Sequence, residues 1–390
     1  MKVFIVAGEA SGDKLGAALM VGLKSLRECV AFHGVAGPLM QEQGMTSLFP
    51  MEELSVMGLA EILPRYRQLV ARIDQVAQAV VQARPDVLIT IDSPDFCHRV
   101  ARRVRKAAPG IPITHYVAPS VWAWRRGRAA KMAGHVDQVL ALLPFEPPYM
   151  TAHGMRCDFV GHPVVAEPMP QPDEIAAFRQ AHGLGARPIL LVLPGSRRNE
   201  VTRLLPVFEQ AVARVIAQRP EMQVVIPAAP AVAELIAQQV ASWRGGPPVV
   251  IDPRAHEPEA AQGVKRTAFA AADVAFAASG TVSLELAAAQ TPMVIAYDLN
   301  WLSWQILSRM VNLNTVTLVN LITGTHTIPE FLGPNCRPEA IAEATLELIE
   351  NAPSRDAQLM AMQEAMIALG AGGEDPGLRA ARAVLDAVGA

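Results

Sequence analysis

Two aspartates follow a run of apolar residues typical of a buried strand. The segment "PDVLITIDSPDF", residues 85–96, places Asp92 and Asp95 directly after that run. Ligands of open α/β sheets bind outside the carboxyl ends of the strands, so both carboxylates are expected at a binding edge. A carboxylate there can act as a general base toward a hydroxyl nucleophile. The letters DSPD also favour an ordinary turn, and this alternative stays open.

A glycine loop near the start of the chain carries acidic residues. "KVFIVAGEASGD", residues 2–13, predicts a strand, a turn and a helix, with Gly8, Glu9, Ser11 and Gly12 in the turn. The glycine spacing matches neither the dinucleotide fingerprint nor the phosphate loop. Glu9 and Asp13 would compete with an anion at the helix start, so the loop suits sugar hydroxyls better than phosphate. The alternative is a tight turn in which Asp13 only caps its own helix.

A second glycine loop has the opposite charge. "ILLVLPGSRRNEV", residues 189–201, runs from a predicted strand through Gly195, Ser196 and Arg197 into a helix. Arginine beside glycine and serine at a helix start is what a diphosphate requires. The alternative, a basic turn that caps a helix, does not explain why the two loops differ in charge.

A third strand–turn–helix segment, "AFAASGTVSLELA", supports a nucleotide site in the same half. Backbone amides at Ser279, Gly280 and Thr281 can face a phosphate. Glu285 is one residue away from the position that a capping box would use, so it is available for ribose hydroxyls. The second half of the chain is therefore predicted to bind the nucleotide.

These loops require two α/β domains to position them. Short apolar strands alternate with helical patterns on both sides of a proline-rich linker at residues 164–174, in a chain of 390 residues. We predict one Rossmann-like domain over residues 1–165 and a second over 166–365. A helix at about 366–390 is expected to pack back on the first domain or on a partner subunit.

The charge of the chain limits the kinds of partner that it is expected to bind. The formal net charge is −3, which implies no general attraction to nucleic acid. The stretch between Asp95 and Asp137 contains no acidic residue and nine Lys or Arg residues, and it also contains Trp122. Such a stretch suits a surface of anionic lipid, although a solvated helix face with buried tryptophans would look the same.

Four scattered cysteines form no metal or disulfide pattern and fit a reducing cytoplasm, and no apolar run is long enough to span a membrane. We predict no metal site and no cofactor.

Several sequence blocks, taken together, resemble the lipid-A-disaccharide synthase family of bacterial glycosyltransferases. They occur in the family's order from residue 8 to about 333, and they are "GEASGD", "LSVMGLAEIL", "IDSPDF", "HYVAPSVWAWRRGR", "LPFEPPYM", "FVGHP", "LPGSRRNEV", "ASGTVSLELA" and "VNLI". The resemblance implies a GT-B fold, with two Rossmann-like domains facing each other across a cleft. It also implies an inverting, metal-independent transfer. UDP-2,3-diacylglucosamine and 2,3-diacylglucosamine 1-phosphate (lipid X) would give a β-1,6-linked disaccharide phosphate and UDP.

The resemblance also implies roles for individual residues. Asp92 would be the general base, Arg197 would contact the UDP phosphates, Glu285 the ribose, and Asn320 would lie near the donor. The basic segment of the first domain would receive the acyl chains and the phosphate of lipid X. The matched blocks place acceptor or sugar contacts at Gly8, Glu9, Ser11, Gly12, Met57, Gly58, Ser120 and Trp122.

The family associates peripherally with the inner membrane, and a homodimer with exchanged C-terminal segments is one expected state. The Ala- and Gly-rich "ALGAGGEDPG" departs from the family pattern and leaves such exchange open. His115 and His162 are further candidates for contacts. Two rival functions remain: a UDP-sugar epimerase of the same architecture, and a non-catalytic, nucleotide-regulated adaptor at the membrane surface.

Overall fold

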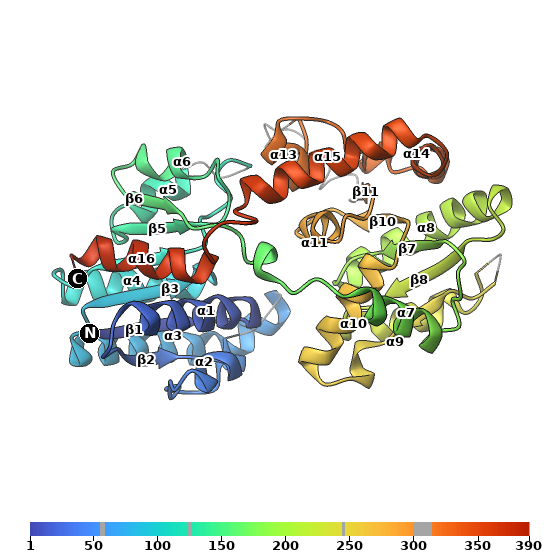
Figure 1. Cartoon of the computed structure of the whole chain (residues 1–390). Helices are drawn as coiled ribbons and strands as arrows, with labels where there is room; N and C mark the ends of the chain where they lie inside the picture. Colours follow the sequence, from blue (N-terminus) through green and yellow to red (C-terminus); the bar gives the residue numbers. More distant parts are fainter. Residues whose placement is uncertain (55–58, 124–126, 244–245, 299–313, 390) are drawn as a thin grey trace. The chain divides into compact units, whose positions relative to one another are not determined.

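The computed structural model describes residues 1–54, 59–123, 127–243, 246–298 and 314–389, and it divides into two compact units (Figure 1). Unit 1 comprises Met1–Ala166 and Leu369–Ala390, and unit 2 comprises Glu167–Ala368. The calls on Met57 and Gly58 lie outside the described residues.

Unit 1 is built on a six-stranded, wholly parallel sheet in the order β2-β1-β3-β4-β5-β6. Its strands are β1 (Lys2–Ala7), β2 (Ala31–Val35), β3 (Val87–Ile91), β4 (Ile113–Tyr116), β5 (Gln138–Ala141) and β6 (Arg156–Phe159). Its helices are α1 (Ala10–Leu26), α2 (Pro38–Glu42), α3 (Leu59–Ala83), α4 (Pro94–Ala107), α5 (Gly127–Met132), α6 (Pro147–Thr151) and α16 (Pro376–Val388). Every residue of β3 is buried, because helices cover both faces of a parallel sheet.

Unit 2 repeats this plan with the strand order β9-β8-β7-β10-β11-β12, again all parallel. Its strands are β7 (Ile189–Leu193), β8 (Gln223–Pro227), β9 (Val249–Ile251), β10 (Val274–Ala278), β11 (Met293–Tyr297) and β12 (Glu330–Leu332). Its helices are α7 (Pro172–Ala181), α8 (Arg198–Gln218), α9 (Ala233–Val240), α10 (Pro258–Ala270), α11 (Val282–Ala288), α13 (Leu318–Thr323), α14 (Pro338–Glu350) and α15 (Ala352–Ala368). The predicted pair of Rossmann-like α/β sheets is confirmed.

Both strand orders contain a topological switch point, where the connections change direction across the sheet. In unit 1 this point lies between β1 and β3, and in unit 2 between β7 and β10. Loops that leave the carboxyl ends of such neighbouring strands diverge and leave a crevice for ligand. The four loops that the sequence singled out follow these four strands.

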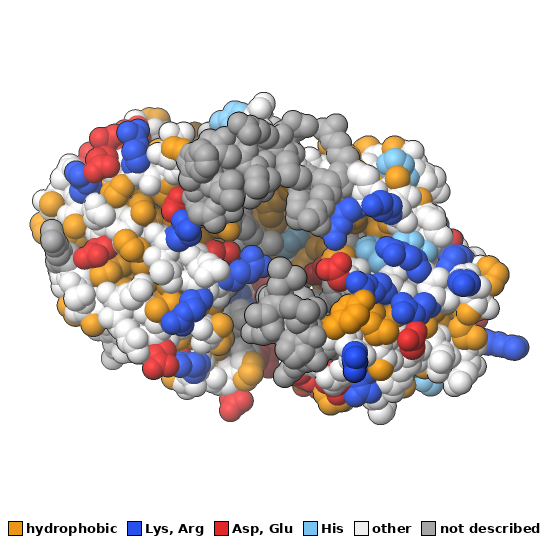
Figure 2. Space-filling model, turned by 180° about the vertical axis from the view of Figure 1, so that it is seen from behind, with side chains coloured by type: hydrophobic (Ala, Val, Ile, Leu, Met, Phe, Trp, Pro, Cys, Tyr) orange, Lys and Arg blue, Asp and Glu red, His pale blue; other side chains and the backbone are white. Residues whose placement is uncertain are grey.

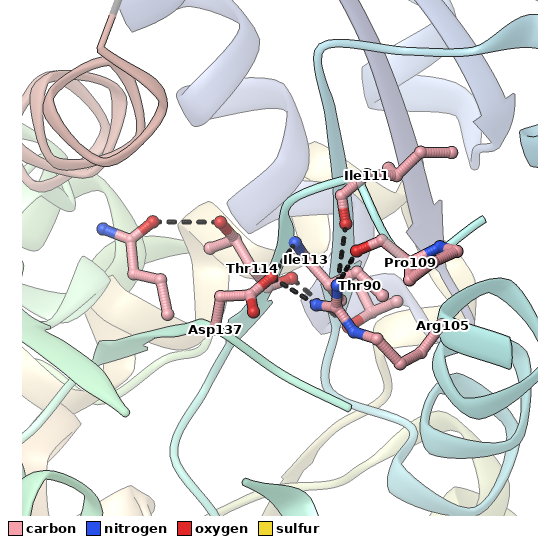
Figure 3. A network of polar contacts seen from close by, with 8 residues as sticks. Thr90, Arg105, Pro109, Ile111, Ile113, Thr114 and Asp137 are labelled. Atoms are coloured by element: carbon pink, nitrogen blue, oxygen red, sulfur yellow. Dashed lines mark hydrogen bonds and ion pairs between the residues drawn. The ribbon is translucent and has the colours of Figure 1, made fainter. Parts of the chain in front are cut away.

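An arginine of α4 fixes this helix to the sheet of unit 1 (Figure 3). Arg105 Nη1 donates to the carbonyl of Pro109 at 2.6 Å, and its Nη2 pairs with the carboxylate of Asp137. The same carboxylate accepts a hydrogen bond from the backbone N–H of Ile113 at 2.8 Å. The end of α4 is thereby held to the starts of β4 and β5, so the side chains along α4 have a defined place over the sheet.

Helix α16 belongs to unit 1 although it follows unit 2 in the chain. It packs against α1, and Figure 1 shows the two helices side by side in red and blue. Their backbones come so close that a Cβ on Gly22 would lie 2.6 Å from the carbonyl oxygen of Gly377. Gln138 Nε2 donates to the carbonyl of Ala383 at 2.8 Å, and Arg379 Nη2 donates to that of Phe159 at 2.9 Å.

Candidate active site

The loops after β1 and β3 touch each other at the switch point of unit 1. A Cβ on Gly8 would lie 2.4 Å from Ser93 Oγ and 2.9 Å from Ser93 Cβ, so no larger residue fits at position 8 without moving the β3–α4 turn. Burial raises the pKa of the Cys97 thiol, and the charges of Asp92 and Glu9 add to this rise. The charges of both carboxylates therefore reach the same thiol, whose Sγ lies 4.0 Å from the carbonyl oxygen of Val6 in β1 and 3.8 Å from that of Ile91 in β3.

Asp92 has the environment of a general base. Asp92 and Ser93 both adopt left-handed backbone conformations, with φ of 47° and 41°. Such strain in residues other than glycine is concentrated at functional sites. The side chain is half-buried, and burial raises its pKa, partly opposed by a hydrogen bond from the Ser93 backbone. A carboxylate with a raised pKa takes up a proton more readily.

Asp95 stands in a different place. It is exposed, in the first turn of α4, and it lines a pocket together with basic side chains of α4 and α5. Of the two aspartates that the sequence left open, Asp92 is the one at the switch point, where it is half-buried and has a strained backbone.

Asp13 does not face the crevice, contrary to the expectation from the acidic loop. Its carboxylate is 2 % exposed and accepts hydrogen bonds from the backbone N–H groups of Gly37, Leu39 and Met40 at 3.0, 2.9 and 3.1 Å. It therefore caps the start of α2 and not its own helix, an arrangement that sequence spacing alone does not show. Glu9 is the N-cap of α1, and exposed Ser11 and buried Gly12 lie in the first turn of this helix, not in the preceding turn as expected.

Trp122 is held from behind by a buried carboxylate. Its indole N–H donates to Glu146 Oε1 at 3.2 Å, and its ring meets Phe145 edge-on with centroids 5.2 Å apart. The indole N–H is thus occupied within unit 1, while the ring remains partly accessible to solvent. Ser120, two residues earlier, is exposed.

Glu146 was not identified from the sequence, yet it connects Trp122 to the backbone that follows β5. It is 4 % exposed and also accepts hydrogen bonds from the backbone N–H groups of Leu142 and Leu143 at 3.2 and 3.0 Å. Burial raises its pKa to about 7, outweighing the opposing effect of its three N–H donors.

The contribution of Glu146 to stability should therefore fall as pH rises from 4.5 to about 7, whereas the buried histidines, whose pKa values are lowered, contribute with the opposite sign. Because the folded-state pKa of Glu146 lies above its ordinary value of 4.5, its contribution is fully present below pH 4.5 and is lost as pH rises through about 7. A shift of this size corresponds to roughly 3 kcal/mol in the free energy of unfolding. Urea denaturation at pH 5, 6, 7 and 8 measures this slope, and Glu146→Gln should flatten it. An equal slope in the variant would assign the pH dependence to another group.

The loop after β7 presents arginine, but its amides are partly occupied. Gly195 has φ +106°, and a Cβ there would lie 2.6 Å from Glu200 Oε2. Glu200 accepts hydrogen bonds from the backbone N–H groups of Ser196 and Arg197 at 3.2 and 3.3 Å. The Arg197 side chain is 70 % exposed and lies 3.4 Å from Glu200. The guanidinium, more than the loop amides, is thus available for an anion. Glu200 could have been found as the N3 residue of a capping box.

The loop after β10 is open to solvent at Gly280 and Thr281, next to half-buried Ser279. Glu285, one turn into α11, forms an ion pair with Lys265 of α10 at 2.5 Å. Each of the two side chains is about one third exposed. The pairing fixes the carboxylate in place while leaving its remaining lone pairs accessible. Lys265 was not identified from the sequence, because its partner is 20 residues away.

Asn320 serves the framework of unit 2. It is 0 % exposed, its Nδ2 donates to the carbonyl of Ile328 at 2.9 Å, and its Oδ1 accepts a hydrogen bond from the N–H of the same residue at 3.0 Å. Nδ2 also lies 3.4 Å from Glu330 Oε1. The amide is thus engaged inside the unit, and the expected place of Asn320 near the donor stays a prediction.

Neither a metal centre nor a membrane span emerges from the part of the chain that the structure describes. Its His, Cys, Asp and Glu side chains do not come together in groups of three or more that could hold a metal ion. Among the same residues, every helix is too short or too polar to cross a bilayer.

Solved structures with the same fold include nucleotide-sugar enzymes. The UDP-GlcNAc 2-epimerase from Neisseria meningitidis, bound to UDP-GlcNAc, matches with a TM-score of 0.64 at 13% identity, covering 99% of both chains. A glycosyltransferase from Rickettsia africae matches with a TM-score of 0.59 at 11% identity, covering 99% of this chain and 98% of the other. At such identities the likeness concerns the fold alone.

Sequence relatives are more specific. A family model described as lipid-A-disaccharide synthetase matches residues 3–375. A lipid-A-disaccharide synthase from Ruegeria pomeroyi is 60% identical over 386 residues, covering 99% of this chain and 95% of that protein. Another, from Rhodospirillum centenum, is 46% identical over 388 residues, covering 99% of this chain and 94% of that protein. Since both the model and the relatives span nearly the whole sequence, this chain belongs to the lipid-A-disaccharide synthase family.

Proposed function

We propose that this protein is an inverting glycosyltransferase of lipid A biosynthesis. It transfers 2,3-diacylglucosamine from UDP to 2,3-diacylglucosamine 1-phosphate, forming a β-1,6-linked disaccharide phosphate and releasing UDP. The observation that carries the proposal is the contrast between the two switch points. The carboxylates of Glu9 and Asp92 follow β1 and β3, whereas an exposed arginine follows β7 and exposed glycine and threonine residues follow β10.

Asp92 takes the proton in this reaction. The acceptor hydroxyl loses its proton to the Asp92 carboxylate as its oxygen attacks the anomeric carbon of the donor. The bond from that carbon to the diphosphate oxygen breaks, and its electron pair leaves with UDP. One displacement inverts the anomeric centre, so a single base and a stabilised leaving group are sufficient.

Unit 2 would hold the donor. Arg197 neutralises charge on the departing diphosphate, and a guanidinium suits this because it can donate two parallel hydrogen bonds to phosphate oxygens. Glu285 accepts hydrogen bonds from ribose hydroxyls and is oriented by Lys265. Asn320 holds the segment around Ile328 in place. No metal is assigned to the leaving group.

Unit 1 would receive the acceptor at the membrane surface. Glu9 and Ser11 bind sugar hydroxyls, and the ring of Trp122 contacts the sugar or its acyl chains. Figure 2 shows Lys, Arg and His side chains gathered on one face of unit 1, and such a face suits anionic lipid. Peripheral association with the inner membrane is part of the proposal.

The epimerase and adaptor alternatives are less well supported. The fold is shared with UDP-GlcNAc 2-epimerases at 13% identity, whereas the synthases match at 60%. An adaptor would have no use for a strained, half-buried carboxylate at a switch point.

The test is an assay of the purified full-length chain in detergent with both proposed substrates, with and without EDTA. Mass spectrometry should detect disaccharide phosphate and UDP in equal amounts, and EDTA should leave the rate unchanged within about twofold. Conversion of the UDP-sugar without acceptor would support the epimerase. Binding of UDP by folded protein with no product at all would support the adaptor.

A further inference from the structure

A basic pocket in unit 1 has no role in the proton transfer just described. It has a volume of about 540 Å³ and lies between α4 and α5. Four cationic side chains and one carboxylate contribute to its wall. The lining residues used below are Asp95, His98, Arg99, Arg102, Arg128 and Lys131.

The pocket is built on a cluster of three histidines. His98 and His115 stack with ring centroids 4.6 Å apart, and His98 meets His135 edge-on at 5.3 Å. His115 and His135 are 2 % and 4 % exposed, and His115 Nδ1 shares a hydrogen bond of 2.8 Å with Thr90 Oγ1. The ring of His98 thus packs on two buried histidines, and its helix, α4, is fixed to the sheet by Arg105.

The cations around His98 are available for an anion. Elsewhere on α4, Arg103 pairs with Asp74 and Arg105 with Asp137. The four cations of the pocket form no ion pair with any acidic side chain among the described residues. Arg99 stacks loosely over Tyr66 at 5.8 Å. Unpaired cations that converge on one concavity attract a compact multivalent anion.

The electrostatics of His98 agree with this geometry. Burial is the largest cause that lowers its pKa, and the charges of His135, Arg102 and Arg128 add to this effect, so that the pKa is about 4 in spite of the opposing effect of Asp95. The charges of both arginines are therefore felt at the imidazole. His98 is neutral at pH 7 and can donate one N–H to a bound oxygen.

We propose that this pocket is the phosphate subsite of the acceptor, binding the phosphate monoester through Arg102, Arg128 and Lys131 with His98 as an N–H donor. This inference rests on the glycosyl transfer proposed above. A monoester dianion brings three strong acceptor oxygens and a charge near −2, which fits several cations better than a carboxylate would.

Position along α4 favours the acceptor as occupant. Pro94 and Asp95, which follow Asp92 in the chain, begin the pocket wall, and His98 lies one helical turn, about 6 Å, beyond Pro94. In glucosamine 1-phosphate the phosphate lies across the ring from the 6-hydroxyl, so an acceptor with its 6-hydroxyl at Asp92 needs a separate phosphate site nearby. The pocket then selects 1-phosphorylated acceptors over unphosphorylated ones.

Binding is tested with glucosamine 1-phosphate and glucosamine on the full chain, by calorimetry and by NMR titration of the histidine rings. Only the phosphate should bind, and it should raise the pKa of His98 by about one unit or more. Lys131→Gln should weaken binding about tenfold, since it removes a charge-assisted hydrogen bond. Asp95→Asn should strengthen it a few-fold, because it removes the one carboxylate.

Lys106→Gln is the matched control, since it removes the same charge from α4 outside the pocket. In the transfer assay, Lys131→Gln should raise the acceptor KM with kcat and donor KM unchanged, whereas Lys106→Gln should not. Equal effects of the two variants, or an unmoved His98, would overturn the inference.

If vesicles containing phosphatidic acid shift His98 but glucosamine 1-phosphate does not, the pocket binds a lipid headgroup and the acceptor assignment is wrong. If the pocket variants transfer the sugar with a normal acceptor KM, the phosphate subsite is wrong but the proposed glycosyl transfer stands. If the protein binds glucosamine 1-phosphate in the pocket but catalyses no transfer, the pocket is a phosphate site but the proposed enzyme activity is wrong.

Discussion

Asp92→Asn lowers kcat by about a thousandfold, while the affinity for UDP and the KM of both substrates change by less than about threefold. The asparagine occupies the same strained turn but cannot accept the proton of the acceptor hydroxyl, so the loss falls on the chemical step. In the unsubstituted enzyme, loss of kcat/KM on acidification should begin at a higher pH than an ordinary aspartate would give, because burial raises the Asp92 pKa.

Asp95→Asn is the informative companion. It changes the same residue type three positions along the chain, at an exposed site, and should retain kcat within about tenfold. If Asp95→Asn abolished transfer and Asp92→Asn did not, the roles of the two aspartates would have to be exchanged. Steady-state kinetics with varied acceptor, together with UDP binding by calorimetry, separate the two cases.

Asp13→Ala destabilises unit 1 by roughly 4 kcal/mol, since it leaves the backbone N–H groups at the start of α2 without an acceptor inside the protein. Gly37 packs directly on this carboxylate, where a Cβ would lie 2.5 Å from Asp13 Oδ2, so the site cannot fill the space easily. At low temperature the variant should keep a normal kcat, and it should lose activity on warming at a lower temperature than the unsubstituted protein, because it unfolds.

Urea denaturation and thermal melts measure this effect, and the matched control is Glu42→Ala at the exposed end of the same short helix. That change should cost less than about 0.5 kcal/mol. If Asp13→Ala had a small effect and its melting temperature equalled that of the unsubstituted protein, water would be replacing the carboxylate at these amides.

The class of fold was predictable because the inner strands of both sheets are apolar runs bounded by turn residues, and every residue of β3, β4, β5, β7 and β10 is buried. The edge strands β2 and β12 have mostly exposed or half-buried residues. Neither has a long apolar run, so their local sequence pattern does not distinguish them from loops.

The site was only partly predictable, for a related reason. Glycines and charged residues after strands indicated the loops, but strand order, which makes β1 neighbour β3 and β7 neighbour β10, depends on pairing between distant segments. Whether a polar side chain serves ligand or framework also depends on distant partners. Asp13 meets amides more than 20 residues away, and burial of Asn320 depends on the segment that leads into β12. The catalytic and binding roles themselves remain predictions.

The return of α16 to α1 has a consequence during synthesis on the ribosome. Unit 1 is discontinuous, so residues 167–368 must be translated before its remaining helix exists. At typical rates of 5–20 residues per second this leaves the α1 surface bare for roughly 10–40 s. A nascent chain in that interval exposes a seam shaped for one particular helix.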